Sequence, residues 1–212
     1  SKFLETMKEH EVIQLGDLGL GFPKELRYNW PPSKTTYNIN ELTNFYPSTN
    51  NFRFIAGNHD HPQLSREHPC YLGDYGTYTT KDEHDIFFIS GATSIPGDGN
   101  REYPGVTWWP DEELSIEQWD KCLELYEKTK PEIVISHCCP HRCIYNIHTK
   151  PLDPVGGLSE RRMNEMIQMH QPKTWIFGHH HKDVVFKFNK TLFVCVGIMS
   201  YRIYNHGIHE IK

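Results

Sequence analysis

The sequence predicts a layered α/β fold, and three features of the chain indicate that class. Short runs rich in β-branched and aromatic residues alternate with segments of helical periodicity. Several of these runs are apolar throughout, which is typical of strands buried on both faces of a sheet. The chain has 212 residues, of which 37% are hydrophobic and 23% are charged, enough for one compact core. We therefore expect a single domain over residues 1–212, without a linker or an internal repeat.

Local patterns predict the individual elements. Ser115 begins a helix, because Gln118 three residues later completes a capping box, and Ile116, Trp119 and Leu123 continue at helical spacing. Further helices are predicted over residues 2–9, 39–46 and 158–170, and their apolar stripes are interpreted as core-facing. Strands are predicted over residues 12–15, 52–56, 77–80, 86–90, 133–135, 174–177, 184–188, 192–196 and 203–211.

Polar blocks directly follow four of the predicted strands. They are, in chain order, Gly16-Asp17, Gly57-Asn58-His59-Asp60, Ser136-His137 and Gly178-His179-His180-His181. In an open α/β sheet, ligands gather beyond the carboxyl ends of the strands. Blocks that lie far apart in the sequence are therefore expected to converge in space.

The residue types in these blocks suit metal ions. The carboxylate of Asp17 can bridge two cations, and the neutral imidazole nitrogens of histidine bind borderline transition metals well. Asn58 offers a carbonyl oxygen, while the adjacent His59 is left free to act as an acid. Two metals held roughly 3.5 to 4 Å apart can clamp a phosphoryl oxygen and activate a water at neutral pH. The candidate imidazole ligands are His137, His179 and His181.

In this order, the four blocks resemble the motifs of the calcineurin-like metallophosphoesterases. Each block alone is common, but all four in sequence at strand ends are specific, and the resemblance covers almost the whole chain. It implies an α/β/β/α sandwich of two mixed sheets flanked by helices. Residues 90–114 are further similar to small bacterial and phage members, through Gly91-Ala92, Ser94-Ile95, Arg101 and Trp108-Trp109-Pro110-Asp111-Glu112-Glu113-Leu114.

The resemblance also implies a set of metal ligands. Asp17 is expected to bridge two divalent ions, with Asn58, His137 and His179 completing the shell of one and His181 binding the other. Mn²⁺ is the expected metal, although Fe, Ni, Co and Zn suit the same mixed nitrogen and oxygen donors.

Catalytic roles follow from the same resemblance. His59 is expected to protonate the leaving oxygen or to stabilise the transition state, and Asp60 is expected to orient the His59 ring. His180, between two predicted ligands, is not expected to bind metal.

The sequence departs from the family pattern before Asp17. The family opens with an Asp-x-His block after its first strand, and no such block precedes Asp17 here. Glu9, His10 and Glu11 follow a predicted helix rather than a strand. We therefore expect the first strand and the Asp-x-His loop to lie outside this sequence, which begins at Ser1. A protein that truly began there would have a defective second metal site.

A second departure lies at Leu20. Serine/threonine phosphatases of the superfamily have a second Asp and an Arg in this region, which orient the catalytic histidine and bind phosphate. Leu20 can do neither. The departure argues against a protein phosphatase and favours a phosphodiesterase or a nucleotide phosphatase, with a small phosphoester or nucleotide as substrate.

Charge and hydropathy restrict the partners. A formal net charge of -5 and a pI near 6.3 do not favour nucleic acid as a partner, although a local basic patch stays open. The apolar runs are far shorter than the roughly 18 residues of a membrane span, and no signal-peptide pattern is visible at this N-terminus. We expect a cytoplasmic protein without a membrane partner, of undetermined oligomeric state.

The cysteines form no evident disulfide framework. Cys138, Cys139 and Cys143 lie near His137 and His141, but their spacing matches no common structural zinc pattern. Thiols in a reducing cytoplasm are the preferred interpretation.

Substrate contacts are predicted from residue chemistry. Arg101 and Arg142 are candidates for gripping phosphate, because guanidinium matches its oxygens bidentately, and a surface role is the equal alternative. His141 is a further candidate in a loop expected to line the site. Trp108 and Trp109 could stack on a nucleobase, but a packed loop anchor is the preferred interpretation.

The sequence therefore predicts a metal-dependent phosphoester hydrolase with a dinuclear centre. In that mechanism a metal-bridging hydroxide attacks phosphorus in line and His59 assists the leaving group. Two alternatives stay open. A non-catalytic scaffold on the same fold is favoured by the absent Asp-x-His block and opposed by the presence of His59. A DNA-processing nuclease would need a basic groove or an accessory DNA-binding domain, and the sequence shows neither.

Overall fold

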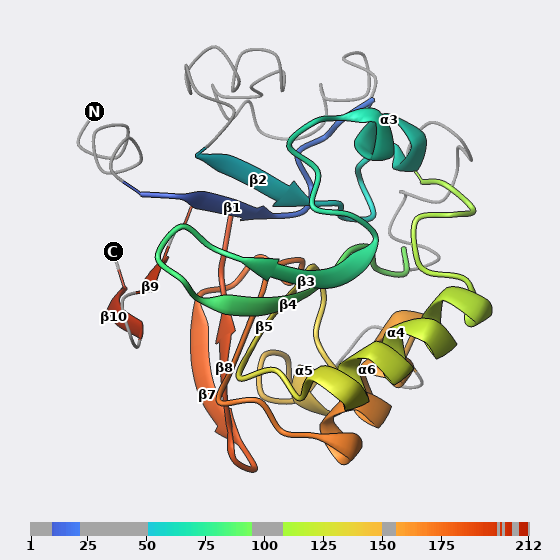
Figure 1. Ribbon diagram of the computed structural model, residues 1–212. Coiled ribbons are helices and arrows are strands. Elements are labelled where there is room, and N and C mark those ends of the chain that lie inside the picture. Colours follow the sequence, from blue (N-terminus) through green and yellow to red (C-terminus); the bar gives the residue numbers. More distant parts are fainter. Residues whose placement is uncertain are drawn as a thin grey trace.

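A six-stranded mixed sheet forms the centre of the computed structural model, which describes residues 10–21, 51–94, 108–149, 156–198, 200, 202–204 and 208–211 (Figure 1). The strand order is β3-β4-β5-β6-β8-β7, with β4, β5, β6 and β8 parallel and the two edge strands antiparallel to their neighbours. The strands are β3 (Tyr75–Thr79), β4 (Asp85–Ile89), β5 (Ile133–Ser136), β6 (Thr174–Phe177), β7 (Val184–Phe188) and β8 (Thr191–Cys195).

A second β-layer lies against one face of this sheet. Strands β1 (Val12–Leu15) and β2 (Phe52–Ile55) pair in parallel, and Figure 1 shows them beside β3 and β4. Ile55 of β2 is buried in one cluster with residues of the larger sheet, and Ile13 and Leu15 of β1 pack against that cluster. The sheet residues are Ile86, Phe88, Ile133 and Ile135. Strands β9 (Arg202–Tyr204) and β10 (Ile208–Ile211) form a separate antiparallel pair.

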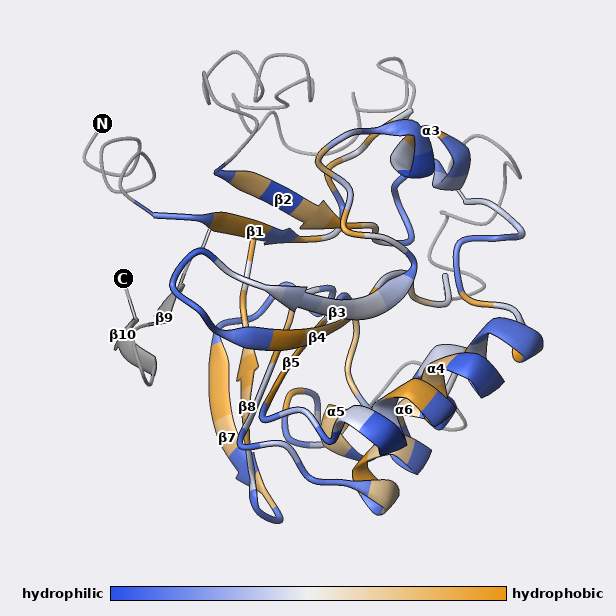
Figure 2. Cartoon of the chain, in the orientation of Figure 1, coloured by the Kyte–Doolittle hydropathy of each residue, from blue (hydrophilic) through white to orange (hydrophobic). Residues whose placement is uncertain are grey.

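Helices cover the other face of the six-stranded sheet. Helix α4 (Ile116–Thr129) begins at the Ser115 cap, where the Ser115 and Gln118 side chains make the reciprocal bonds of a capping box. Helix α6 (Leu158–Met169) and the one-turn α5 (His141–Ile144) contact each other, and α4 contacts α6. Figure 2 shows polar and apolar residues interspersed along α4, as expected for a helix with one buried face.

Side-chain alternation explains why the central strands are apolar on both faces. On β4, Phe87 and Ile89 point to the helices, where they join Trp119 and Tyr126 of α4. The alternate residues of the same strand join the cluster between the two β-layers. All four residues of β5 are buried. These layers confirm the α/β class and the arrangement of two sheets flanked by helices.

Most of the predicted elements are confirmed, with bounds shifted by one or two residues. The prediction of one strand over residues 203–211 is wrong, because β9 and β10 pair with each other. Helix α3 (Pro62–Glu67) and helix α5 were missed. The helices predicted over residues 2–9 and 39–46 lie outside the described residues. No helix in the described part of the chain has the length and apolar character needed to cross a membrane.

Candidate metal centre

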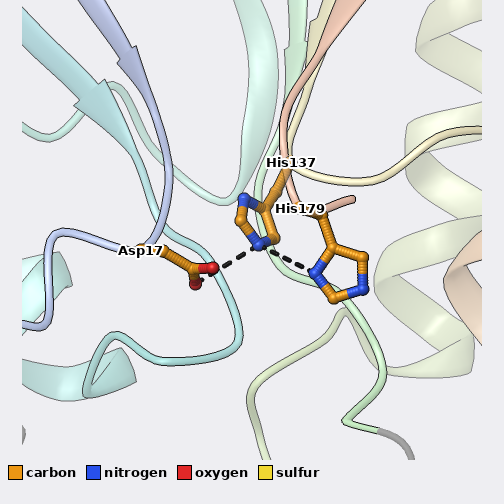
Figure 3. A group of neighbouring side chains, drawn as sticks. All are labelled: Asp17, His137 and His179. Carbon is orange, nitrogen blue, oxygen red and sulfur yellow. Dashed lines mark hydrogen bonds and ion pairs between the residues drawn. The ribbon is translucent and has the colours of Figure 1, made fainter. Parts of the chain in front are cut away.

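The polar blocks converge where four strands end. Asp17 follows β1, Asn58 follows β2, His137 follows β5 and His179 follows β6. Figure 3 shows Asp17, His137 and His179 pointing toward one another from their separate segments. One ligand atom from each of these three residues lies within 4.8 Å of the others. The site therefore combines residues of the β1–β2 pair with residues of the six-stranded sheet.

His137 lies at the middle of the group. Its Nε2 atom is 3.1 Å from Asn58 Oδ1, 3.3 Å from Asp17 Oδ1 and 3.2 Å from His179 Nδ1. The other ring nitrogen, Nδ1, lies 2.6 Å from the carbonyl oxygen of Leu15. Because a carbonyl oxygen only accepts, Nδ1 carries the proton of that bond and Nε2 faces the centre. A backbone carbonyl in this position fixes the ring orientation that a metal ligand needs.

The backbone at the predicted ligands is in an uncommon conformation. Asp17, His179 and His181 have φ values of 60°, 64° and 54°, in the left-handed region that residues other than glycine rarely adopt. Each such residue costs on the order of 1–2 kcal/mol. Strained residues of this kind cluster at functional sites, where the surrounding structure holds them in place.

Gly57 allows the two halves of the site to approach. A Cβ atom at Gly57 would lie 2.2 Å from Asp17 Oδ1, 2.5 Å from the Asp17 backbone nitrogen and 2.7 Å from His137 Cε1. No side chain fits at those distances. Glycine is therefore required at position 57 for a steric reason that the sequence alone did not show.

Electrostatics favour cation binding at the group. Burial raises the pKa of Asp17, but the charge and hydrogen bond of His137 outweigh burial and hold that pKa well below its usual range. Burial lowers the pKa of His137, whereas Asp17 and the Leu15 carbonyl raise it, and the net direction is upward. Burial and the charge of His137 lower the pKa of His179. The Asp17 carboxylate therefore stays ionised at the group, where it can hold a cation.

The predicted catalytic residues lie beside the group. The backbone N–H of His59 donates to Asp17 Oδ1 at 3.1 Å. The carboxylate of Asp60 is buried and accepts from the backbone N–H groups of Gly57, at 2.9 Å, and Leu20, at 3.0 Å. Burial and the charge of Asp17 raise the pKa of Asp60. These bonds connect the loops after β1 and β2, and the orientation of the His59 ring by Asp60 stays a prediction.

The other two histidines of the last block differ in environment. His181 is outside the close group, but the Asp17 carboxylate acts on its pKa, which burial lowers overall. The ring of His180 packs edge-on against Phe177, and its Nε2 lies 3.4 Å from Cys139 Sγ. Burial lowers the pKa of His180 to about 3. His180 therefore belongs to the packing behind the site, while the role of His181 as a ligand stays a prediction.

The predicted substrate contacts are not brought to the group by any described interaction. Arg101 lies outside the described residues. Arg142 is exposed on α5, where its backbone N–H donates to Asn164 Oδ1 at 3.1 Å. His141 is buried, with its ring against Tyr145. Trp109 is only 4% exposed, which agrees with a packed loop anchor rather than a base-stacking surface.

The cysteines lie outside the candidate ligand group. None of the six forms a disulfide, and all are buried. Within the described ranges, the group with metal-ligand spacing is Asp17, His137 and His179, and it contains no sulfur atom. This agrees with the interpretation of the cysteines as ordinary thiols.

The residues of the group fit a divalent metal ion. A carboxylate, an amide carbonyl and two imidazoles converge at hydrogen-bond distances, and this mixed donor set suits Mn²⁺ as well as the later transition metals. The pKa of His179 is held low, and a neutral imidazole is the form that binds metal.

Sequence reasoning gave no role to two residues that the structure connects to the group. Asn58 Nδ2 donates to Ser94 Oγ at 3.1 Å, and Ser94 Oγ donates to Glu112 Oε2 at 2.8 Å. Both residues belong to the segment that carries the resemblance to small family members. Their only signal was that position, since nothing in the local pattern shows a buried contact with Asn58.

Comparison with known protein families identifies the family of this chain. The calcineurin-like phosphoesterase family matches residues 2–183, and the chain belongs to that family. Its members are mostly metal-dependent hydrolases of phosphoesters. A search of curated proteins found no match to this chain.

Proposed function

We propose that this protein is a metal-dependent phosphoester hydrolase that uses two divalent ions, Mn²⁺ being the proposed metal. The observation that carries the proposal is the convergence of Asp17, Asn58, His137 and His179 at the ends of four strands, in a chain that belongs to a phosphoesterase family. Asp17 and His181 are assigned to the second ion. The bound metals supply Lewis-acid activation of water and neutralisation of the phosphoryl oxygens.

The side chains of the protein position the reaction and move its proton. His59 would protonate the leaving oxygen, and its backbone N–H donates to Asp17 Oδ1, which places the residue beside the carboxylate that would hold the metal ions. Asp60 ties the Leu20 loop to Gly57 and keeps His59 next to the group. Arg101 and Arg142 are proposed to contact the phosphate.

The proposed substrate is a phosphodiester or a nucleotide. Leu20 occupies the region where protein phosphatases of the superfamily have polar residues, and it packs against the apolar cluster of Phe52 and Phe54. An apolar side chain that packs in this way cannot bind phosphate. The buried thiols, which form no disulfide, fit a reducing compartment, and we propose a cytoplasmic location.

Metal content and hydrolysis of an aryl phosphodiester test the proposal together. The wild-type protein should bind Mn²⁺ and hydrolyse bis(p-nitrophenyl) phosphate, and His59→Ala should lower kcat by roughly 10² to 10⁴-fold, the usual contribution of a general acid. His10→Ala, an exposed histidine outside the group, is the matched control and should keep full activity. Full activity of His59→Ala would refute the acid role. Two bound ions without hydrolysis of any ester would indicate a non-catalytic scaffold.

A further inference from the structure

Asn58 can bind a metal only through its carbonyl oxygen, and the two ends of its amide group have nearly the same shape. We propose that Glu112 and Ser94 form a positioning relay that turns Asn58 Oδ1, rather than Nδ2, toward the metal centre. The inference rests on the proposed function, since it takes Asn58 as a ligand.

The relay is a continuous buried chain of hydrogen bonds. Glu112, Ser94 and Asn58 are 6%, 1% and 3% exposed. Glu112 Oε1 accepts from the Ser94 backbone N–H at 2.7 Å, and Glu112 Oε2 accepts from Ser94 Oγ at 2.8 Å. Ser94 Oγ in turn accepts from Asn58 Nδ2 at 3.1 Å, which leaves Asn58 Oδ1 3.1 Å from His137 Nε2.

The donor and acceptor of each hydrogen bond in the relay follow from the carboxylate of Glu112. A carboxylate only accepts, so the single hydroxyl proton of Ser94 goes to Glu112. The lone pairs of Ser94 Oγ then face Asn58, and only the NH₂ end of the amide can donate to them. The carbonyl end must point the other way, toward His137. The charge of Glu112 thus determines which atom of Asn58 faces the metal centre.

The backbone holds the relay in place. The N–H of Gly91, just after β4, donates to the carbonyl of Ala56, just after β2, at 2.7 Å. A Cβ atom at Gly91 would lie 2.3 Å from the backbone oxygen of Glu112, so the segment that carries Glu112 packs directly on this strand end. Glu112 and Asn58 are therefore fixed to the same edge of the fold by contacts independent of the relay itself.

Glu112→Gln should reverse the relay with little change of shape. Two backbone N–H groups that cannot turn donate to Glu112, that of Ser94 to Oε1 at 2.7 Å and that of Trp109 to Oε2 at 3.4 Å. The shorter bond is the stronger one, so the new amide should present its carbonyl oxygen to the Ser94 N–H and its NH₂ group to Ser94 Oγ, while the Trp109 N–H loses its long bond. The Ser94 hydroxyl is then available to donate to Asn58 Oδ1. The NH₂ group of Asn58 would face the metal centre, and an amide NH₂ group cannot act as a ligand.

Mn²⁺ affinity, measured by calorimetry on the folded protein, tests the relay without relying on activity. Glu112→Gln and Ser94→Ala should each bind Mn²⁺ roughly 10 to 100-fold more weakly, the usual effect of removing an outer-shell partner. The control is Glu113→Gln on the neighbouring residue. The Glu113 carboxylate likewise accepts several bonds, from Thr93 Oγ1 and from the Ser159 hydroxyl and backbone N–H, but no relay bond joins it to Asn58. The Glu113→Gln variant should bind Mn²⁺ with the affinity of the wild-type protein.

A second background separates orientation from simple loss of charge. With Asp at position 58, both candidate ligand atoms are oxygens, and the one hydroxyl proton of Ser94 is shared between two carboxylates. In the Asn58→Asp background Glu112→Gln therefore leaves an oxygen facing the metal centre, and it should lower Mn²⁺ affinity clearly less than it does when Asn58 is present. A pure charge effect would lower affinity by the same factor in both backgrounds.

The outcomes distinguish the relay from the proposed function. Three results would overturn the relay and leave the proposed function standing. The Glu112→Gln and Glu113→Gln variants could lose the same amount of Mn²⁺ affinity, or Glu112→Gln could bind Mn²⁺ like the wild-type protein. Glu112→Gln could also lose the same amount of affinity in the wild-type and Asn58→Asp backgrounds. If the Glu112→Gln variant does not fold, the Ser94→Ala variant decides the question. Wild-type Mn²⁺ affinity in Ser94→Ala would then overturn the relay. A wild-type protein that binds no Mn²⁺ would overturn the proposed function and the relay with it.

Discussion

Gly57→Ala should damage the proposed metal centre while preserving its candidate ligands. The added Cβ atom would lie 2.2 Å from Asp17 Oδ1, where ordinary contact begins at 3.4 Å, so the carboxylate would move by about 1.2 Å. Rotation of the side chain cannot relieve the contact completely, because the Asp17 backbone nitrogen would be only 2.5 Å away. Overpacking of this kind costs about 1–3 kcal/mol, and misplacement by about 1 Å can lower the rate of catalysis by about 10²-fold.

Mn²⁺ calorimetry and thermal unfolding measure the two effects separately. Gly178→Ala is the matched control, since it adds the same methyl group beside His179 and its nearest heavy atoms would lie at 3.4 Å or more, in ordinary contact. Gly57→Ala should lose most of its Mn²⁺ affinity and remain folded, whereas Gly178→Ala should bind like the wild-type protein. The steric argument is wrong if the two variants bind Mn²⁺ equally well.

Four further outcomes are expected. Ser115→Ala removes the cap of α4 and should lower the free energy of unfolding by about 1 kcal/mol in urea titrations; an unchanged midpoint would contradict the capping geometry. Burial raises the pKa of the Cys122 and Cys143 thiols to about 12, so iodoacetamide at pH 8 should modify them only after unfolding, as mass spectrometry can show, and rapid labelling of the native protein would argue against their burial. Because these thiols keep their protons in the folded state while the unfolded chain loses them above the ordinary thiol pKa of 9.0, stability should be highest below that pH and fall as pH rises toward 12. Mn²⁺ at 100 times its Kd should stabilise the protein by about 2.7 kcal/mol in unfolding experiments, and no shift would mean that the folded state has no specific site.

The sequence was most informative where strands end in polar blocks. The apolar runs before Asp17, Asn58, His137 and His179 are the strands β1, β2, β5 and β6, and parallel pairing explains why their ends meet. The capping-box residues Ser115 and Gln118 located the start of α4, because a cap depends only on residues close together in the sequence. These features depend on periodicity and capping, which a single sequence displays.

The remaining features depend on contacts between distant segments. Helix α5 has four residues and α3 has six, and neither is long enough to show a helical period. The last strand pair was predicted as one strand, although the sequence Asn205-His206-Gly207 between its members contains turn-forming residues. The Glu112–Ser94–Asn58 contacts join residues 18 and 36 positions apart, and no local pattern encodes them.

The proposed ligands come from two different sheets, and this has a consequence for how the protein opens. Asp17 and Asn58 belong to the β1–β2 pair, whereas His137 and His179 belong to the six-stranded sheet. An ion held by all four is a cross-link between the two layers, in addition to the apolar cluster between them. Partial unfolding in which β1 and β2 leave the larger sheet would then require release of the metal. Metal binding should therefore suppress this local opening in particular.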